Sequence, residues 1–305
     1  MCKVLMITNI KHVDKTVEFV KLMGEKMSAY NSDGLGYAAL SSSNKLFGER
    51  WFKNDKAFKP RKTTLSNPFG DAVSMKDSNP YSSFGDIDLQ NVKSILLHTR
   101  MATCDKTLAN VHPFVKEDTA LIHNGVVRNP ETYKPTISTC DSEALLNGYL
   151  EYDVGKNPEE LQSMISPLAG YWAVGLYTKV DNTWILDIFK QGASLDVLYI
   201  HELEVWVFAT NSYDVEEVCT KLGYKCSEKG EVHSNTHIRM NPLTGEVIFS
   251  KLLTVEKPPV TRTAFAEDYK GTRPYSSWEK EEPEIEVYDG KSFSEYVMKN
   301  KRFKY

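Results

Sequence analysis

A cysteine directly follows the first methionine, in the opening segment MCKVLMITN. Because a small second residue lets an aminopeptidase remove Met1, Cys2 can become an N-terminal residue with both a thiol and a free α-amino group. The reference pKa of an α-amino group is roughly 7.7–8.0, so a useful fraction is unprotonated near neutral pH and can accept the thiol proton. Cys2 is therefore a candidate nucleophile that carries its own base. Its position alone also fits a buried structural cysteine at the start of a strand.

Three further polar segments lie at the ends of predicted strands, where functional residues tend to gather: HTRMAT (98–103), HNG (123–125) and TCDSEAL (139–145). Amide cleavage produces an oxyanion, and the Asn124 side-chain amide and the Gly125 backbone N–H are suitable donors for it. If the substrate is a free amino acid, Arg100 can bind its α-carboxylate through two parallel hydrogen bonds, and Asp141 can bind its α-ammonium group. Thr103 can add a hydroxyl hydrogen bond.

Each of these residues also has a structural interpretation. Arg100 can be a surface ion-pair partner, and Asn124-Gly125 is a favourable dipeptide for a type I′ turn. Asp141 can be the N-cap of a helix over 142–152. His98 and His123 are predicted to be hydrogen-bonded structural residues, and Cys140, Cys219 and Cys226 are predicted to be inert.

The elements that must position these residues are mostly short strands. The apolar pattern predicts helices over 13–29 and 141–152 and another that begins near Asp214. It predicts strands over 3–9, 31–40, 92–100 and 119–125, and two strands around the Pro-Leu-Thr-Gly turn that follows residue 240. Four successive β-runs between 170 and 211 are typical of a meander.

Two segments differ in composition from the rest. Residues 54–91 form an irregular region rich in Lys, Pro, Ser, Asn and Asp, and a loop of that length inside a domain is usually functional. Residues 256–305 are rich in proline and charge, and they lack apolar periodicity apart from a short basic stretch at the end. We therefore expect one domain over 2–255 and a C-terminal extension over 256–305 that can dock a partner.

The composition excludes several classes of protein. A formal charge of −4 over 305 residues argues against non-specific nucleic-acid binding, and the longest apolar runs, such as WVFA, are far too short to span a membrane. No secretory signal is recognisable. The five cysteines are odd in number and lack CxxC spacing, which argues against a disulfide framework and a zinc site. A cytoplasmic protein without metal or cofactor is the expectation.

The order and spacing of Cys2, HTRMAT, HNG and CDSE resemble those of the class II glutamine amidotransferases. LAGYWAVGLY, VWVFATN and NPLTGEVI are similar to later strands of that family, so the resemblance covers residues 2–255. It implies an α+β fold of the N-terminal-nucleophile hydrolase type, a four-layer αββα sandwich of two mainly antiparallel sheets. It also implies hydrolysis of the glutamine side-chain amide to glutamate and ammonia. The roles it implies are Cys2 as nucleophile, Asn124 and Gly125 as oxyanion hole, and Arg100, Thr103 and Asp141 as the glutamine-binding residues.

The sequence departs from the family's pattern at Met101, where an aromatic residue is common, and at Cys104-Asp105. His112-Pro113 resembles a recurring pair that we interpret as structural. Signatures of a synthetase, a phosphate loop or a phosphoribosyl-binding site were not found, so we expect a separate ammonia-accepting synthetase or aminating subunit as partner. Two alternatives stay open: a hydrolase of a related γ-glutamyl amide or peptide, and a non-catalytic regulatory subunit that retains the glutamine pocket.

Overall fold

The computed structural model describes residues 2–54, 57–59 and 91–254. Most of the irregular region 54–91 and the whole extension 256–305 lie outside the described residues, so the expectations for them stay predictions. In the described part, no helix is long and apolar enough to cross a membrane.

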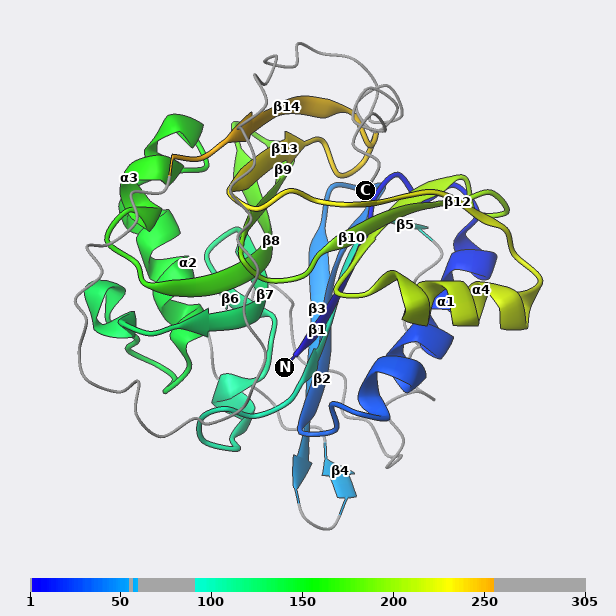
Figure 1. Ribbon diagram of the computed structural model, residues 1–305, viewed down its shortest axis with the longest axis horizontal. Coiled ribbons are helices and arrows are strands. Elements are labelled where there is room, and N and C mark those ends of the chain that lie inside the picture. Colours follow the sequence, from blue (N-terminus) through cyan, green and yellow to red (C-terminus); the bar gives the residue numbers. More distant parts are fainter. Residues whose placement is uncertain (1, 55–56, 60–90, 255–305) are drawn as a thin grey trace, which may run out of the picture.

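The described strands form two sheets in which every pairing is antiparallel (Figure 1). The first, sheet A, has the strand order β12 (Cys226–Glu231), β10 (Asp196–Ile200), β11 (Val205–Ala209), β1 (Lys3–Ile7), β5 (Val92–Arg100), β2 (Gly34–Ser41), β3 (Leu46–Asn54) and β4 (Ala57–Lys59). The second, sheet B, has the order β14 (Val247–Leu252), β13 (Thr236–Met240), β9 (Thr183–Gln191), β8 (Gly170–Val180), β7 (Thr119–Val127) and β6 (Phe114–Lys116).

Helices cover the outer faces of both sheets. The helices α1 (Val13–Ser28) and α4 (Ser212–Leu222) pack on sheet A, and α2 (Asp141–Glu151) and α3 (Leu161–Ile165) pack on sheet B (Figure 1). Short 3₁₀ turns lie at Leu108–Asn110, Pro130–Tyr133 and Pro158–Glu160. The order of layers is helices, sheet, sheet, helices, which confirms the predicted αββα sandwich.

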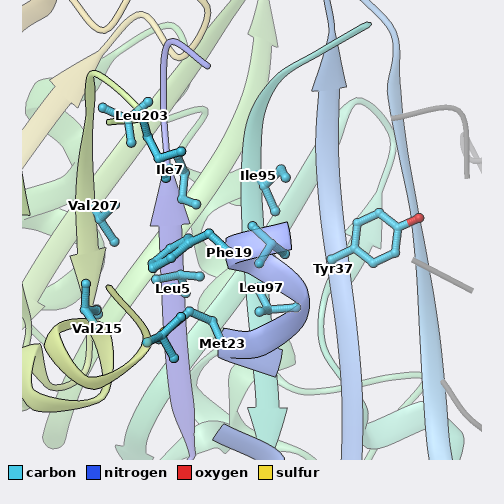
Figure 2. Packing of buried hydrophobic residues seen from close by; sticks show 14 of the residues in the cluster. Leu5, Ile7, Phe19, Met23, Tyr37, Ile95, Leu97, Leu203, Val207 and Val215 are labelled. Carbon is cyan, nitrogen blue, oxygen red and sulfur yellow. The ribbon is translucent and has the colours of Figure 1, made fainter. Parts of the chain in front are cut away.

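Three apolar clusters hold the layers together, and strand β1 contributes to two of them. Leu5 and Ile7 pack against α1, as Figure 2 shows beside Phe19 and Met23, whereas Val4 and Met6 pack between the sheets. Because successive side chains of a strand point to opposite faces, this alternation requires β1 to be buried on both sides. The apolar run behind Cys2 is therefore a central strand.

The predicted meander over 170–211 is wrong. Strands β8 and β9 belong to sheet B, but β10 and β11 belong to sheet A, so the chain crosses between the sheets after β9. Gly192 begins the crossing with φ +68°, a backbone conformation that residues with a Cβ rarely adopt. Local periodicity cannot reveal this change of sheet, because all four strands look alike in sequence.

A buried ionic cluster connects the C-terminal half of helix α2 to sheet B. Asp187 in β9 is fully buried and accepts hydrogen bonds from Arg239 Nε at 2.8 Å, Arg239 Nη2 at 2.6 Å, His237 Nε2 at 2.8 Å and Tyr149 Oη at 2.6 Å. Arg239 also donates to the backbone carbonyls of Val154 and Gly155. The cluster therefore fixes the C-terminal half of the helix that begins with Asp141.

Replacing Asp187 with Asn is expected to lower the free energy of unfolding by about 3–5 kcal/mol, because it leaves Arg239 buried without its counter-charge. Although burial alone would raise the pKa of Asp187, the hydrogen bonds from Arg239 and His237 hold it well below its usual range. The carboxylate's stabilisation is thus complete above the ordinary Asp pKa of about 3.9 and is lost as the pH falls below it. Urea unfolding should give Asp187→Asn a lower free energy of unfolding than the wild type at pH 7. The difference between the two proteins should shrink as the pH falls below 4. The exposed Asp118→Asn serves as control, and an equal effect of both variants would contradict this account.

Candidate active site

The strand register brings the start of the chain beside the HTR motif. Lys3 of β1 pairs with Thr99 of β5, so Cys2 lies at the level of Arg100, the last residue of β5. The half-buried Cys2 Sγ donates a weak hydrogen bond to the Met101 carbonyl at 3.6 Å. The thiol is therefore held at the end of sheet A, next to the segment that the sequence singled out.

Side-chain alternation turns the candidate residues of both sheets toward each other. In β1 and β5 the side chains of Val4, Met6 and Leu96 face sheet B. Cys2 and Arg100 are separated from them by an even number of residues, so they lie on the same face. In β7, Ala120 and Ile122 face sheet A, and Asn124 continues that row. The hydrogen bond between His98 Nε2 and the His123 carbonyl, at 3.1 Å, joins the ends of β5 and β7. Cys2, Arg100 and Asn124 thus converge at one end of the interface between the sheets.

Arg100 is a buried cation, with 2% of its surface exposed. Its Nη2 donates to the Asp105 carbonyl at 2.9 Å and to the Cys104 carbonyl at 3.3 Å, and it lies 3.2 Å from Cys104 Sγ. Its Nη1 is buried and has no hydrogen-bond partner among the described residues. One side of the guanidinium is therefore fixed by the protein, and the other can donate to a ligand. The interpretation of Arg100 as a surface ion-pair residue is wrong.

Asn124 is fully buried, and neither its Oδ1 nor its Nδ2 has a hydrogen-bond partner in the described part of the chain. Buried polar groups are nearly always paired, and an unpaired one costs about 1–3 kcal/mol. Asn124 and Gly125 pair with Ala173 and Trp172 of β8, so they lie inside a strand and do not form a type I′ turn. A buried amide with unused donors is suited to bind a group that the protein itself does not supply.

Glycine is required at position 125 on steric grounds. Its φ is +149°, and a Cβ there would lie 2.1 Å from the Tyr171 carbonyl oxygen and 2.8 Å from His123 Nε2. Both contacts are closer than real Cβ atoms allow, so any side chain would displace the strand. The positive φ occurs within the continuous pairing of β7 with β8, at the residue whose N–H the sequence proposed as an oxyanion donor.

Asp141 begins helix α2, and Cys140 occupies the N-cap position. Instead of capping its own helix, Asp141 Oδ2 accepts the backbone N–H of Val127 at 2.6 Å. The carboxylate is half-buried and is thereby attached to β7, two residues beyond Gly125. Thr103 is exposed in the loop after β5, and no described hydrogen bond connects it with the other candidates.

The charges of Arg100 and Asp141 both act on the Cys2 thiol. Burial raises the pKa of Cys2 most strongly, the Arg100 charge opposes that shift, and the Asp141 charge adds to it. The net pKa lies above the ordinary thiol value, so the thiol is protonated at neutral pH. A base must therefore remove its proton before it can act as a nucleophile. Burial lowers the pKa of His98 to about 3 and also lowers that of His123, so both rings are neutral.

Two supporting residues escaped sequence reasoning. The Glu143 carboxylate accepts hydrogen bonds at 2.7–3.2 Å from Thr136, Ile137 and Ser138, which holds the loop before α2. Asn110 Nδ2 donates to Thr139 Oγ1 and to the Asp105 carbonyl, both at 2.8 Å, and joins that loop to the loop after Arg100. Glu143 stands inside the CDSE motif, which was a signal for it. Nothing in the sequence pointed to Asn110.

Cys104 is expected to be a reactive thiol. A hydrogen bond with the Cys140 thiol is the main cause that lowers its pKa to about 6; burial opposes this shift, and Arg100 reinforces it. Because the thiolate is the nucleophile, alkylation of Cys104 by iodoacetamide should rise between pH 5 and pH 7. The same hydrogen bond, reinforced by burial, raises the pKa of Cys140, which should stay unmodified over that range. Peptide mass mapping measures both, and a midpoint for Cys104 near pH 8.5 would contradict the assignment.

Comparison with solved structures identifies the fold. One similar structure is glutamine phosphoribosylpyrophosphate (PRPP) amidotransferase from B. subtilis, complexed with ADP and GMP, with a TM-score of 0.54 and 16% identity over 84% of this chain and 50% of that one. Another is described as the allosteric regulatory enzyme of purine biosynthesis, with a TM-score of 0.56, 16% identity and the same coverage of 84% and 50%. At this identity the likeness establishes the shared fold. The chain spans about half the length of each of these two proteins. No protein-family model and no curated protein matches the sequence.

Proposed function

We propose that this protein hydrolyses the side-chain amide of L-glutamine, with Cys2 as the nucleophile. The observation that carries the proposal is the fully buried Asn124 amide, which has no partner among the described residues and lies on the sheet face toward the Cys2 strand. A polar group of this kind costs stability, which is the usual mark of a functional site. The shared fold with a glutamine-dependent amidotransferase supports the choice of substrate.

The reaction begins once Met1 has been removed and the α-amino group of Cys2 is free. That amine takes the thiol proton, and Sγ attacks the side-chain carbonyl carbon of glutamine. The Asn124 side-chain amide and the Gly125 backbone N–H donate to the oxyanion of the tetrahedral intermediate. The α-ammonium of Cys2 then gives its proton to the departing amide nitrogen, which leaves as ammonia and gives a thioester. Water hydrolyses the thioester, which yields glutamate and restores the thiol.

Arg100, Asp141 and Thr103 bind the amino-acid end of glutamine. The unpaired Nη1 of Arg100 donates to the α-carboxylate, and the half-buried Asp141 accepts from the α-ammonium group. Thr103 belongs to the proposal as a hydroxyl donor on the exposed loop after β5. Both charges lie close enough to the thiol to shift its pKa, the Arg100 cation downward and the Asp141 carboxylate upward, so a substrate held by both groups lies near Cys2.

The test is a comparison of substrates on the purified chain. Release of glutamate and ammonia in equal amounts from L-glutamine is the expected result. Turnover of γ-glutamyl dipeptides without turnover of glutamine would replace this proposal with a γ-glutamyl hydrolase. Glutamine binding by calorimetry without any turnover would replace it with a regulatory subunit.

The proposal extends to the fate of the ammonia. We assign it to an acceptor enzyme in a separate chain; the likeness of the fold to an amidotransferase, a class of enzyme that transfers the amide nitrogen, supports the existence of an acceptor. Affinity purification from the native host should recover an aminating enzyme or synthetase together with this protein. Recovery of the protein without such an enzyme would remove this part of the proposal and leave glutamine hydrolysis untouched.

A further inference from the structure

Buried hydrogen bonds connect the three polar motifs to one another, through residues that the proposed reaction does not use. His98 Nε2 lies 3.1 Å from the His123 carbonyl, and His123 Nδ1 lies 2.8 Å from Ser142 Oγ. All three side chains are at most 2% exposed. His98 belongs to HTR, His123 to HNG and Ser142 to CDSE, so each motif contributes one residue to this series of hydrogen bonds.

The chemistry of the partners fixes the direction of the first bond. A carbonyl oxygen only accepts, so His98 must carry its hydrogen on Nε2 and donate it. With its pKa lowered to about 3 by burial, His98 keeps this neutral form throughout the physiological range. In the second bond either His123 Nδ1 or Ser142 Oγ can be the donor, and in both cases the bond joins the His123 ring to helix α2.

These bonds constrain Asn124 from both sides. Within β7 the His123 side chain faces α2, while the next residue, Asn124, faces sheet A. The His123 carbonyl is held by β5, its ring is held by α2, and the ring also packs against Gly125, where a Cβ would lie 2.8 Å from Nε2. A shift of His123 in any direction would therefore move the oxyanion donors relative to Arg100 and Asp141.

We infer that His123 is the positioning residue of this site, which holds the oxyanion-hole segment of β7 at a fixed place between helix α2 and strand β5. The inference rests on the proposed glutamine hydrolysis and assigns His123 no contact with substrate. Because small displacements of catalytic donors are costly, the geometry predicts a large effect on the chemical step and a small effect on binding.

His123→Phe keeps the size of the ring and removes its hydrogen bond, and His123→Asn keeps a polar group close to the place of Nδ1. We expect the Phe variant to lose about 10–100-fold in kcat, with the KM for glutamine changed by less than about threefold. The Asn variant should recover at least a tenth of the wild-type kcat. Loss of kcat in the Phe variant without recovery in the Asn variant, or a loss confined to KM, would overturn the inference.

Ser142→Ala removes a single oxygen and tests the same hydrogen bond with a smaller change, in case the His123→Phe variant does not fold. It should lower kcat in the wild-type background and add no further loss in the His123→Phe background, because both changes break the same bond. Additive losses would show that the two residues act independently, which contradicts the inference. Thermal unfolding, recorded for each variant, confirms that kcat is measured on folded protein.

A measurement that needs no turnover separates this inference from the proposed function. The ring ¹⁵N resonances should show His98 as the neutral Nε2–H form from pH 8 to pH 5, and His123→Phe should leave that pattern unchanged. A neutral His98 that carries its hydrogen on Nδ1 instead of Nε2 would contradict the series of hydrogen bonds even in an active protein. If these hydrogen bonds are present but the wild type does not hydrolyse glutamine, the proposed function fails. If the wild type is active and His123→Phe keeps full kcat, only the positioning role fails.

Discussion

Cys2→Ala is expected to abolish the release of ammonia from glutamine while leaving the fold intact. The thiol supplies the only atom that forms a covalent bond with the substrate in this account, so removing it ends turnover. The structural cost is small, because Cys2 is half-buried and its thiol donates a weak hydrogen bond of 3.6 Å to the Met101 carbonyl. Activity is measured by coupled glutamate and ammonia assays, and folding by circular dichroism and thermal unfolding.

A matched cysteine makes the result specific. Cys226 in β12 is also half-buried, and it lies far along sheet A from β5, with β10, β11 and β1 between them. Cys226→Ala should keep full glutaminase activity. Full activity of Cys2→Ala would contradict the proposed nucleophile, and equal loss in both variants would show that the assay responds to general destabilisation.

Asn124→Ala is expected to slow glutamine hydrolysis by about 3 kcal/mol of transition-state stabilisation, or on the order of 10²-fold in kcat, because it removes one oxyanion donor. The same change should not destabilise the protein. In the described structure the Asn124 amide is buried and unpaired, so replacing it with an apolar side chain relieves an unsatisfied group. Loss of activity together with unchanged or increased stability is the combined prediction.

Steady-state kinetics and urea unfolding, measured on one preparation of Asn124→Ala, test the predicted loss of activity and the predicted unchanged or increased stability. Asn157→Ala, at an exposed asparagine of a 3₁₀ turn, is the control and should change neither quantity. A loss of several kcal/mol in unfolding free energy for Asn124→Ala would mean that the amide has a structural partner. An unchanged kcat would remove Asn124 from the oxyanion hole.

The fold was predictable where apolar runs are long and their ends are marked. The strand expected over 92–100 and the helix expected from residue 141 or 142 correspond closely to β5 and α2. Short or partly exposed strands were missed, namely β3, β4, β6 and β12, because they carry little periodicity; β4 lies inside the region 54–91 that was expected to be irregular. Which strands share a sheet was not readable either, since that depends on contacts between residues far apart in the chain.

Sequence reasoning selected the candidate residues of the site but not the contacts that connect them. Residue types and their places at strand ends suggested Cys2, Arg100, Asn124 and Asp141. The dipeptide Asn124-Gly125 stayed ambiguous in sequence, and only its pairing with β8 distinguishes a strand from a turn. The bond of Asp141 to Val127 spans 14 residues and that of His98 to His123 spans 25, and no local pattern encodes such pairs.

The central claim is that Cys2 is an N-terminal nucleophile poised for a glutamine side chain. The most direct measurement is intact and peptide mass spectrometry after treatment with an electrophilic glutamine analogue, such as a γ-diazoketone or chloroketone amino acid. The account predicts one adduct per chain, on a Cys2 that has lost Met1, and protection by excess glutamine. An adduct on Cys104 with Cys2 unmodified, or labelling of a chain that still begins with Met1, would contradict it.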